Sequence, residues 1–437
     1  MKPDKGRITA FYVLKRVLIL GGYSNISLDE EIKKNNLLPE DKKLAAKICY
    51  GVLERKITLE IILERFANRK PKPEIEIIIL MGIYQALFLD NIPNHAVVNS
   101  SVELAKTFSK NKAQAGFVNA ILHSVLREPK ENLLSFAFET ETGKYSISKE
   151  MLSIIKNSLG EKTDLFLNES FGRPPIYIKV NTLKTSTENL VETLKSENIE
   201  AEYIEGFENA LKISGKLDIA KTESYKNGLF FVQDLSSQFA INALEIAPED
   251  TVFDLCAAPG GKSFSAAMSL KGGKITSFDI HGHKVELIKK SALRLGISNL
   301  DAEVKNALDV SGRENSADKI ICDVPCSGSG VLRRKPEIRY KNENLKDIYR
   351  LQFEILSAAA KMVRPGGKIL YSTCSVNKKE NEDIVKSFLM GNLEFKALKY
   401  YGIYDKIIRS SDFGTTILPE HFGGDGFFFC VLERKNK

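Results

Sequence analysis

Six short apolar runs mark the second half of the chain, and longer segments with helical periodicity separate them. The runs are Val252–Leu255, Lys274–Phe278, Asp301–Val304, Lys319–Cys322, Lys368–Tyr371 and Phe427–Leu432. Strands that alternate with crossover helices form parallel sheets whose two faces are both covered. We therefore predict a doubly wound, largely parallel α/β sheet in residues 241–437.

The first third of the chain has a different period. Apolar residues recur there at spacings of three and four, as at Ile8, Phe11 and Leu14, and short breaks with Pro or Gly separate the segments. This pattern predicts an all-helical bundle in residues 1–130, followed by a helical connector in residues 131–169. Residues 170–240 begin with an alternating strand pattern and contain an amphipathic helix, which predicts a small α+β unit.

The composition excludes several classes of protein. With 43% hydrophobic and 27% charged residues, the chain is expected to fold as a globular protein. No stretch reaches the roughly 20 apolar residues of a membrane span, and no signal-peptide cleavage site follows the N-terminus. The six cysteines form no CxxC pair, which favours reduced thiols over disulfides. We expect a cytoplasmic protein without a membrane anchor.

The net charge of +7 is confined to the predicted helical bundle. Residues 1–130 contain 21 Lys and Arg against 14 Asp and Glu, so the remainder of the chain is neutral. A basic domain beside a neutral one suggests contact with a polyanion such as nucleic acid, and ordinary solvated helix faces are the alternative.

A glycine-containing loop follows the first predicted strand, at the sheet edge where doubly wound folds bind ligands. Its sequence ends in Gly-Lys-Ser, but a phosphate-binding P-loop needs glycine at the position of Cys256. Gly260 and Gly261 allow a close backbone approach, and Asp279 ends the second strand, where a carboxylate can accept from a ribose. The loop fits either a nicotinamide dinucleotide or S-adenosylmethionine, and Asp279 as a helix cap is the alternative.

Two cysteines follow neighbouring strands at the same edge. Cys326 comes after the fourth predicted strand and Cys374 after the fifth, so we expect both thiols at the ligand-binding edge. Thiols in that position suggest nucleophilic chemistry, whereas zinc binding would require ligand spacings that the chain lacks. Cys49, Cys322 and Cys430 are expected to be buried apolar residues.

Several motifs resemble one family of enzymes. They are Asp254-Leu-Cys-Ala-Ala-Pro-Gly-Gly-Lys-Ser263, Asp323-Val-Pro-Cys-Ser-Gly-Ser-Gly-Val-Leu-Arg-Arg334, Tyr371-Ser-Thr-Cys-Ser375 and Glu380-Asn-Glu382. Together they are similar to the S-adenosylmethionine-dependent RNA cytosine-5 methyltransferases of the RsmB/NOP family. Lys179–Lys184, Val232–Ser237 and Gly424–Phe429 extend the resemblance. The first third, through Asn91–Asn99 and Gly116–Leu122, resembles the NusB-like helical RNA-binding domain.

The resemblance implies a cofactor, a site and a substrate. It implies S-adenosylmethionine held by Cys256, Ala257, Ala258, Pro259, Gly260, Gly261, Lys262, Asp279, Asn306 and Asp323. Asn306 stands where the family carries an acid, and Asp309 is the alternative. In this family the cysteine matching Cys374 attacks the base, and the one matching Cys326 helps to release the product. The implied partner is small-subunit (16S) ribosomal RNA, with no metal and no membrane, and we expect a monomer with an RRM-like second unit.

The chemistry of cytosine also calls for these residue types. Carbon C5 is a poor nucleophile, so a thiolate must first add to C6, which is the role that we expect for Cys374. A carboxyl group near N3 and the amino group, which we assign to Asp323, would stabilise charge on the ring. Arg333–Lys335 are candidates for phosphate contacts or for a solvated charge run. Transfer-RNA methylation and a non-catalytic RNA-binding factor are the alternative functions.

Overall fold

The computed structural model describes residues 4–109, 111–215, 218–341, 344–399 and 410–436. The contacts within the chain define two units, which are Met1–Lys156 with Leu332–Asn342, and Asn157–Val331 with Glu343–Lys437. The chain therefore passes between the units three times, after residues 156, 331 and 342. We describe each unit by itself.

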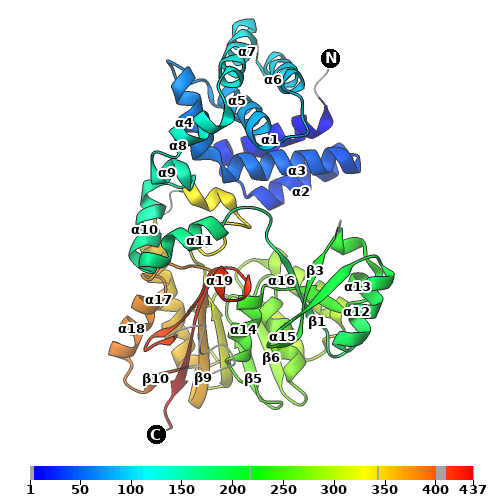
Figure 1. Cartoon of the computed structure of the whole chain (residues 1–437). Helices are drawn as coiled ribbons and strands as arrows, with labels where there is room; N and C mark the ends of the chain where they lie inside the picture. The colour runs from blue at the N-terminus through cyan, green and yellow to red at the C-terminus, as the bar shows by residue number, and fades with distance from the viewer. Residues whose placement is uncertain (1–3, 110, 216–217, 342–343, 400–409, 437) are drawn as a thin grey trace. The chain divides into compact units, whose positions relative to one another are not determined.

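The first unit is a bundle of α-helices (Figure 1). They are α1 (Lys5–Leu20), α2 (Ser24–Asn35), α3 (Pro39–Glu54), α4 (Lys56–Phe66), α5 (Pro73–Phe88), α6 (Asn94–Phe108), α7 (Lys112–Arg127), α8 (Lys130–Ala137), α9 (Glu141–Lys144) and α10 (Lys149–Leu159), whose end belongs to the second unit. Helix α5 is buried on nearly all sides because its sequence is apolar all round, so it forms the centre of the core. Among the described residues, no helix is both long enough and apolar enough to cross a bilayer.

The segment Leu332–Asn342 belongs to the helical unit although it is distant in sequence. It forms a short 3₁₀-helix, η3 (Pro336–Tyr340), that packs against α3. The carboxylate of Glu337 accepts hydrogen bonds from the backbone N–H of Ser24, at 3.0 Å, and from its hydroxyl, at 2.9 Å. Residue Tyr23 supplies no side-chain cap to α2, so Glu337 takes that role from 313 positions away. Arg339 is fully buried and donates to the carbonyl of Tyr145 at 2.8 Å.

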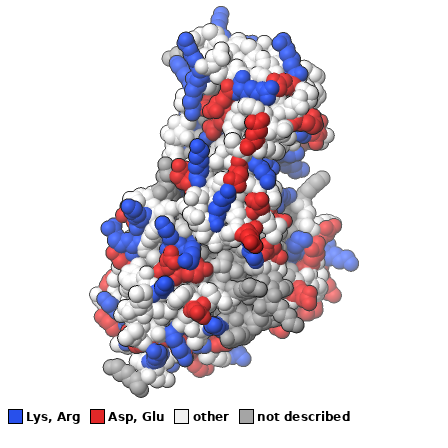
Figure 2. Space-filling view, turned by 60° about the vertical axis from the view of Figure 1, so that its left-hand side comes forward, with Lys and Arg blue, Asp and Glu red and all other residues white. Residues whose placement is uncertain are grey.

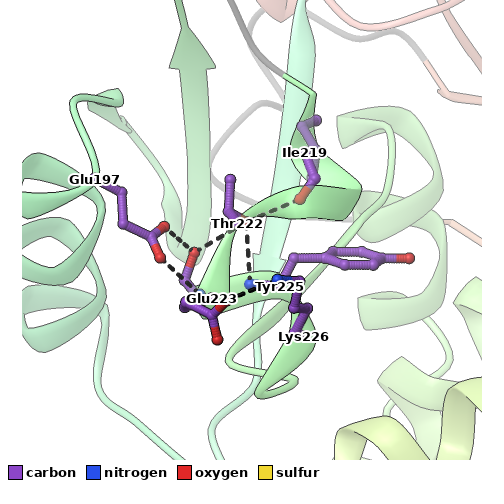
Figure 3. Close-up of polar contacts among 7 residues, drawn as sticks. Glu197, Ile219, Thr222, Glu223, Tyr225 and Lys226 are labelled. Carbon is purple, nitrogen blue, oxygen red and sulfur yellow. Dashed lines mark hydrogen bonds and ion pairs between the residues drawn. The ribbon is translucent and has the colours of Figure 1, made fainter.

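The second unit begins with two short helices and a small antiparallel sheet. The helices are η1 (Gly160–Lys162) and α11 (Thr163–Glu169), and the sheet has the order β2 (Glu200–Ile204), β3 (Phe207–Ser214), β1 (Ile176–Val180), β4 (Phe230–Val232). Helix α12 (Thr187–Ser196) packs on β2 and β3, and a short 3₁₀-helix, η2 (Ile219–Lys221), precedes α13 (Glu223–Lys226). Glu197 accepts from the backbone and the hydroxyl of Ser224 at 2.9 and 2.5 Å, which ties α13 to the end of α12 (Figure 3).

A nine-stranded mixed sheet forms the rest of this unit. Its strands are β5 (Thr251–Asp254), β6 (Lys274–Asp279), β7 (Leu300–Val304), β8 (Ala317–Asp323), β9 (Val363–Thr373), β10 (Phe395–Leu398), β11 (Ser410–Ser411), β12 (Gly414–Ile417) and β13 (Phe427–Arg434). The spatial order is β11-β12-β13-β9-β8-β5-β6-β7, and β10 pairs with β13. Strands β5 to β9 are parallel to one another, whereas β13 runs antiparallel to β9.

Helices cover both faces of this sheet (Figure 1). They are α14 (Leu235–Asn242), α15 (Gly261–Ser269), α16 (Gly282–Leu295), α17 (Leu345–Met362), α18 (Glu382–Gly391) and α19 (Pro419–Phe422). Successive strand residues face opposite cores, since Val252 joins the cluster with α14 to α16 and Phe253 joins the one with α17 and α18. This double burial explains why β5, β8 and β9 have continuous apolar sequences.

The predicted fold class is confirmed: a helical bundle, a small α+β unit and an α/β sheet follow one another along the chain. All six predicted strand runs of the second half are strands. The sheet is less parallel than predicted, because its C-terminal strand returns as the antiparallel β13. Strands β10, β11 and β12 were not predicted because each has four residues or fewer. Strand β3 was not predicted because its sequence mixes polar and apolar residues.

The cap that Glu337 places on α2 leads to a stability prediction. Glu337→Ala removes the only acceptor in the described chain that the N–H of Ser24 is seen to use. We expect the free energy of unfolding to fall by about 1 to 3 kcal/mol, the cost of leaving buried donors unsatisfied. Urea denaturation followed by circular dichroism measures this loss. Glu354→Ala, an exposed position on α17, is the control, and equal losses in both variants would contradict the capping role.

Candidate active site

The parallel pairing of β8 and β9 brings the two predicted cysteines together. Asp323 at the end of β8 lies opposite Ser372 near the end of β9, so the loops that follow leave the sheet at the same level. The sulfur atoms of Cys326 and Cys374 are 3.2 Å apart. The structure thus places the two thiols in contact at the carboxyl edge of the sheet.

Asp323 and Lys262 form an ion pair beside these thiols. Oδ2 of Asp323 lies 2.7 Å from Nζ of Lys262, and the hydroxyl of Ser372 donates to Oδ1 at 2.8 Å. The side chain of Lys262 is only 8% exposed, and its ammonium lies 5.0 Å from the ring centre of Phe427. The ammonium is therefore held in place by the ion pair at a nearly buried position, whereas the side chain of Asp323 is 35% exposed.

The loop between β5 and α15 has the tight shape that its glycines suggest. Gly260 adopts φ of 106°, and a Cβ atom there would lie 2.4 Å from the ring of Phe264. Helix α15 begins at Gly261, so its first N–H groups are directed toward the edge of the sheet. The N–H of Ala257 donates to the carbonyl of Phe278 at 2.9 Å, which fixes the loop against the end of β6.

A cavity of about 240 Å³ lies where these loops meet. It is lined by Val232, Gln233, Asp234, Ser237, Asp254, Ala257, Ala258, Pro259, Gly261, Lys262, Asp323, Val331, Cys374, Asp425 and Phe427. The lining includes most of the predicted loop residues, together with Asp323 and one of the two thiols, Cys374. Cys256, Gly260, Cys326, Asp279 and Asn306 are not among the lining residues.

Asp279 is the last residue of β6, and Asn306 lies two residues beyond the end of β7. Asp279 is 7% exposed, and its Oδ1 accepts from the N–H of His281 at 2.9 Å. The pKa of the Cys256 thiol is raised mainly because the thiol is buried, and the charge of Asp279 adds to this effect. Asn306 is exposed, and its Oδ1 accepts from the N–H of Leu308 at 3.0 Å. Asp309 is also exposed, and hydrogen bonds from Ser311 lower the pKa of its carboxyl. All three side chains therefore stabilise local turns in this structure.

Two segments outside the predicted site contribute to the cavity. Gln233 and Asp234 come from the junction of β4 and α14, and Asp425 and Phe427 come from the C-terminal loop and β13. Oδ1 of Asp234 accepts from the N–H groups of Ser236 and Asp425, at 2.9 and 3.1 Å, and thereby joins the two segments. The motifs Val232–Ser237 and Gly424–Phe429 carried this signal in the sequence, but residue chemistry alone did not indicate a site there.

Two glycines allow the loops to cross closely. The N–H of Gly330 donates to the carbonyl of Cys374, and the N–H of Gly426 donates to the carbonyl of Gly330, both at 3.0 Å. A Cβ atom on Gly330 would lie 1.9 Å from the carbonyl oxygen of Gly426. The loops after β8 and β9 and the loop before β13 are thus in direct backbone contact.

Burial shifts the pKa values of several groups at this edge. Asp254, buried beneath the cavity, has a pKa raised to about 7 by burial, against the opposing effect of a hydrogen bond from Ser263. The hydrogen bond to Cys374 and burial together raise the pKa of Cys326. Cys326 therefore remains a neutral thiol at physiological pH. Cys49, Cys322 and Cys430 are buried as predicted.

The described residues contain no cluster of three or more His, Cys, Asp or Glu side chains that could hold a metal ion. The polar groups at this edge instead form one ion pair, a pair of thiols and the buried carboxyl of Asp254. Such a set fits nucleophilic and acid–base chemistry on an organic substrate.

Comparison with known proteins identifies the parts of the chain. Residues 241–433 match the family described as 16S rRNA methyltransferase RsmB/F, residues 4–127 match the NusB family, and residues 150–220 match the ferredoxin-like domain of RsmF/B-like methyltransferases. The crystal structure of the protein PH0851 covers 99% of this chain with a TM-score of 0.84 at 26% identity. A methyltransferase homologue from Pyrococcus horikoshii covers 66% with a TM-score of 0.56 at 25% identity.

Curated relatives match over the whole length. The probable ribosomal RNA small subunit methyltransferase B of Bacillus subtilis is 34% identical over 100% of both chains. The protein of the same name from Synechocystis is 30% identical over 98% of this chain and 99% of its own length. With its NusB domain, its ferredoxin-like domain and its methyltransferase sheet, the chain belongs to the RsmB/F family of methyltransferases.

Proposed function

We propose that this protein uses S-adenosylmethionine to methylate C5 of a cytidine in small-subunit ribosomal RNA, through a covalent bond between Cys374 and C6 of the base. One observation carries the proposal. Two thiols lie 3.2 Å apart at the sheet edge, and Cys374, beside the pair of Lys262 and Asp323, lines the cavity. The names of the relatives, which are small-subunit RNA methyltransferases, support the choice of RNA.

The residues at the cavity fit the proposed cofactor. Within the described chain, Oδ1 of Asp254 and Nε2 of Gln233 are buried without a hydrogen-bond partner, and both residues line the cavity. An acceptor and a donor of this kind match the ammonium and carboxylate groups of an amino acid such as the methionine part of the cofactor. Gly261 and the start of α15 add N–H groups, and we assign the ribose to Asp279 with Asn306 nearby. When bound, the cofactor supplies an electrophilic methyl group.

Within this proposal, the two thiols have different roles because their surroundings differ. Cys374 lines the cavity and adds its sulfur to C6, which makes C5 nucleophilic. Cys326 lies outside the lining and stays protonated, since the hydrogen bond with Cys374 and burial raise its pKa. It holds a proton next to the attacking sulfur, and we assign it to the last step, in which the bond between sulfur and C6 breaks.

Asp323 and Lys262 hold the proton that the ring needs. As the sulfur adds to C6, negative charge develops toward N3, and the Lys262–Asp323 pair, joined at 2.7 Å, can donate one proton there. Ser372 fixes the second oxygen of Asp323, which leaves the carboxyl group in one orientation. After methyl transfer a base removes the proton from C5. The bond between sulfur and C6 then breaks, N3 returns its proton to the Lys262–Asp323 pair, and the thiol of Cys326 donates a hydrogen bond to the departing thiolate of Cys374.

The substrate base has to be unstacked, because C6 is inaccessible within an RNA helix. We assign the flanking RNA to the NusB domain and the ferredoxin-like domain. On the face shown in Figure 2, Lys and Arg side chains lie among Asp and Glu side chains and form no single uninterrupted patch. Ion pairs such as Lys15–Glu74 and Arg16–Glu30 neutralise part of the basic charge of the helical unit. On this face the positive charge is thus distributed, and such charge suits contacts with RNA phosphates better than recognition of RNA bases.

The proposed activity predicts one modified base in ribosomal RNA. We expect purified protein with S-adenosylmethionine to methylate small-subunit ribosomal RNA, and bisulfite sequencing to show a protected cytosine. The same base in RNA from a deletion strain should be unprotected. Methylation of transfer RNA instead would favour the alternative substrate, and retained protection in the deletion strain would contradict the proposal.

The two cysteines should have separable effects. Cys374→Ala removes the attacking sulfur, so methylation and any covalent RNA complex should both disappear. Cys326→Ala leaves attack and transfer possible but slows elimination, so a protein–RNA adduct should accumulate and survive denaturing gel electrophoresis. An adduct formed by Cys374→Ala and absent from Cys326→Ala would reverse the assignment of the two roles.

The raised pKa of Asp254 predicts how cofactor binding depends on pH. Below its pKa of about 7 the free protein holds Asp254 mostly protonated, so binding an ammonium group there requires loss of a proton. Affinity should rise about tenfold per pH unit from roughly pH 5.5 to pH 7 and level off before the amino group of the ligand titrates near 8. Isothermal calorimetry measures this rise of cofactor affinity with pH, and the rise should be absent in Asp254→Asn. The same slope in the variant would place the ammonium elsewhere.

A further inference from the structure

A single buried carboxylate connects the two cysteine loops. Glu380 is fully buried just before α18. Its Oε1 accepts from the hydroxyls of Ser327, at 2.5 Å, and Ser375, at 2.8 Å, and its Oε2 accepts from the N–H of Ser327 at 2.8 Å. Ser327 directly follows Cys326, and Ser375 directly follows Cys374. One side chain is therefore bonded to the residue next to each thiol.

Neutral amides complete the set of donors around Glu380. Nδ2 of Asn377 donates to Oε1, and Nε2 of Gln352 donates to Oε2, each at 3.1 Å. The same nitrogen of Gln352 also donates to the carbonyl of Pro325, just before the first cysteine, at 2.9 Å. A buried charge is expensive to desolvate, and the five hydrogen bonds to the two oxygens of Glu380 hold this carboxylate in one arrangement. The carboxylate thus fixes the loop on both sides of Cys326.

The contact between the thiols depends on the register of these two loops. Cys326 and Cys374 both lie beyond the last paired residues of β8 and β9, so the strand ladder brings their loops together but does not by itself fix the contact between the thiols. Besides Glu380, the loops are joined by hydrogen bonds of Ser327 with Ser375 at 3.2 Å, of Ser329 with Ser375 and Val376, and of Gly330 with Cys374. Ser327 and Ser375 directly follow the two cysteines, and Glu380 accepts from the hydroxyls of both, so it holds this contact as well.

We propose that Glu380 is a positioning residue that holds the Cys326 and Cys374 loops in the register in which the thiols touch and Cys374 faces the cavity. This role adds a residue to the proposed covalent mechanism, and its importance for catalysis rests on the proposed attack by Cys374. Glu380 acts through Ser327 and Ser375 and is not assigned contact with the reacting atoms. Glu380→Gln keeps the shape of the side chain but replaces one acceptor oxygen with an amide group that faces donors.

The first test measures the register without RNA or cofactor. The reduced full-length protein is treated with glutathione disulfide, which takes two electrons from the two thiols and becomes two glutathione thiols. Mass spectrometry follows the disulfide between Cys326 and Cys374. We expect it to form in the natural protein and to form roughly 10 to 100 times more slowly in Glu380→Gln, since misplacing the thiols by about 1 Å has effects of this size.

Glu382→Gln is the matched control. Glu382 is a partly buried carboxylate two residues away, and its hydrogen bond to the hydroxyl of Thr416, at 3.3 Å, reaches neither cysteine loop. This variant should form the disulfide at the natural rate. Cofactor affinity should be similar in both variants, because Glu380 forms no hydrogen bond with the loop between β5 and α15 among the described contacts. Thermal melting checks that each variant is folded at the temperature of the assay.

The second test uses the RNA adduct in the Cys326→Ala background. Adding Glu380→Gln should lower the rate of adduct formation at saturating RNA by roughly 10 to 100 times. The RNA concentration at half saturation should stay unchanged, because Glu380 positions the thiol and does not hold RNA. A general loss of folding would instead alter the melting temperature and both constants together.

The two tests separate the positioning role from the proposed function. Different disulfide rates with no adduct in any variant would support Glu380 as the positioning residue and contradict covalent catalysis. Three results would overturn the positioning role. They are an equal rate of disulfide formation in folded Glu380→Gln and the natural protein, an equal slowing of this rate in Glu382→Gln, and no disulfide in the natural protein. If Glu380→Gln does not fold, Ser327→Ala replaces it in the first test, because it removes one hydrogen bond to Glu380. We then expect the disulfide to form roughly three to ten times more slowly than in the natural protein, and an unchanged rate overturns the positioning role.

Discussion

The parallel pairing of β8 with β9 is the constraint on which the rest of the site depends. In a parallel pair both chains leave the sheet at the same edge, and here the last paired residues are Asp323 and Ser372. The loops beyond them start side by side with the same direction. A thiol contact, an ion pair below it and a backbone crossing at Gly330 can form only because this register places the loops together.

Two carboxylates whose oxygens have several partners hold the loops of the site together. Glu380 carries its charge inside the protein against neutral donors, whereas Asp323 shares its charge with Lys262 and Ser372. The two environments, neutral donors around Glu380 and an ion pair at Asp323, suit different roles. In the roles that we propose, the ion pair at the cavity supplies a proton to the ring, while Glu380, surrounded by amide and hydroxyl donors, orients its neighbours. The proposals thus give one carboxyl group a chemical role and the other a positioning role.

Much of this arrangement follows from the sequence, because it depends on local patterns. Apolar runs such as Lys319–Cys322 mark doubly buried strands, and two cysteines after neighbouring strands have to meet if those strands are parallel. Other features depend on contacts between distant residues. The cap of Glu337 on α2, the contribution of Gln233 to the cavity and the short strand β12 have no periodicity or spacing that a single sequence displays. Asn306 was placed by family resemblance, and its side chain stabilises its own turn.

The helical unit is discontinuous in sequence, and this affects the order in which it can fold during synthesis. Domains generally fold from the N-terminus as the ribosome makes them. Residues 1–156 emerge early, but the segment Leu332–Asn342, which caps α2 and contains the buried Arg339, emerges only after residues 157–331, which include the first four strands of the large sheet, β5 to β8. The nascent helical unit therefore lacks this segment while about two fifths of the chain is made, and the side-chain cap of α2 is absent until then.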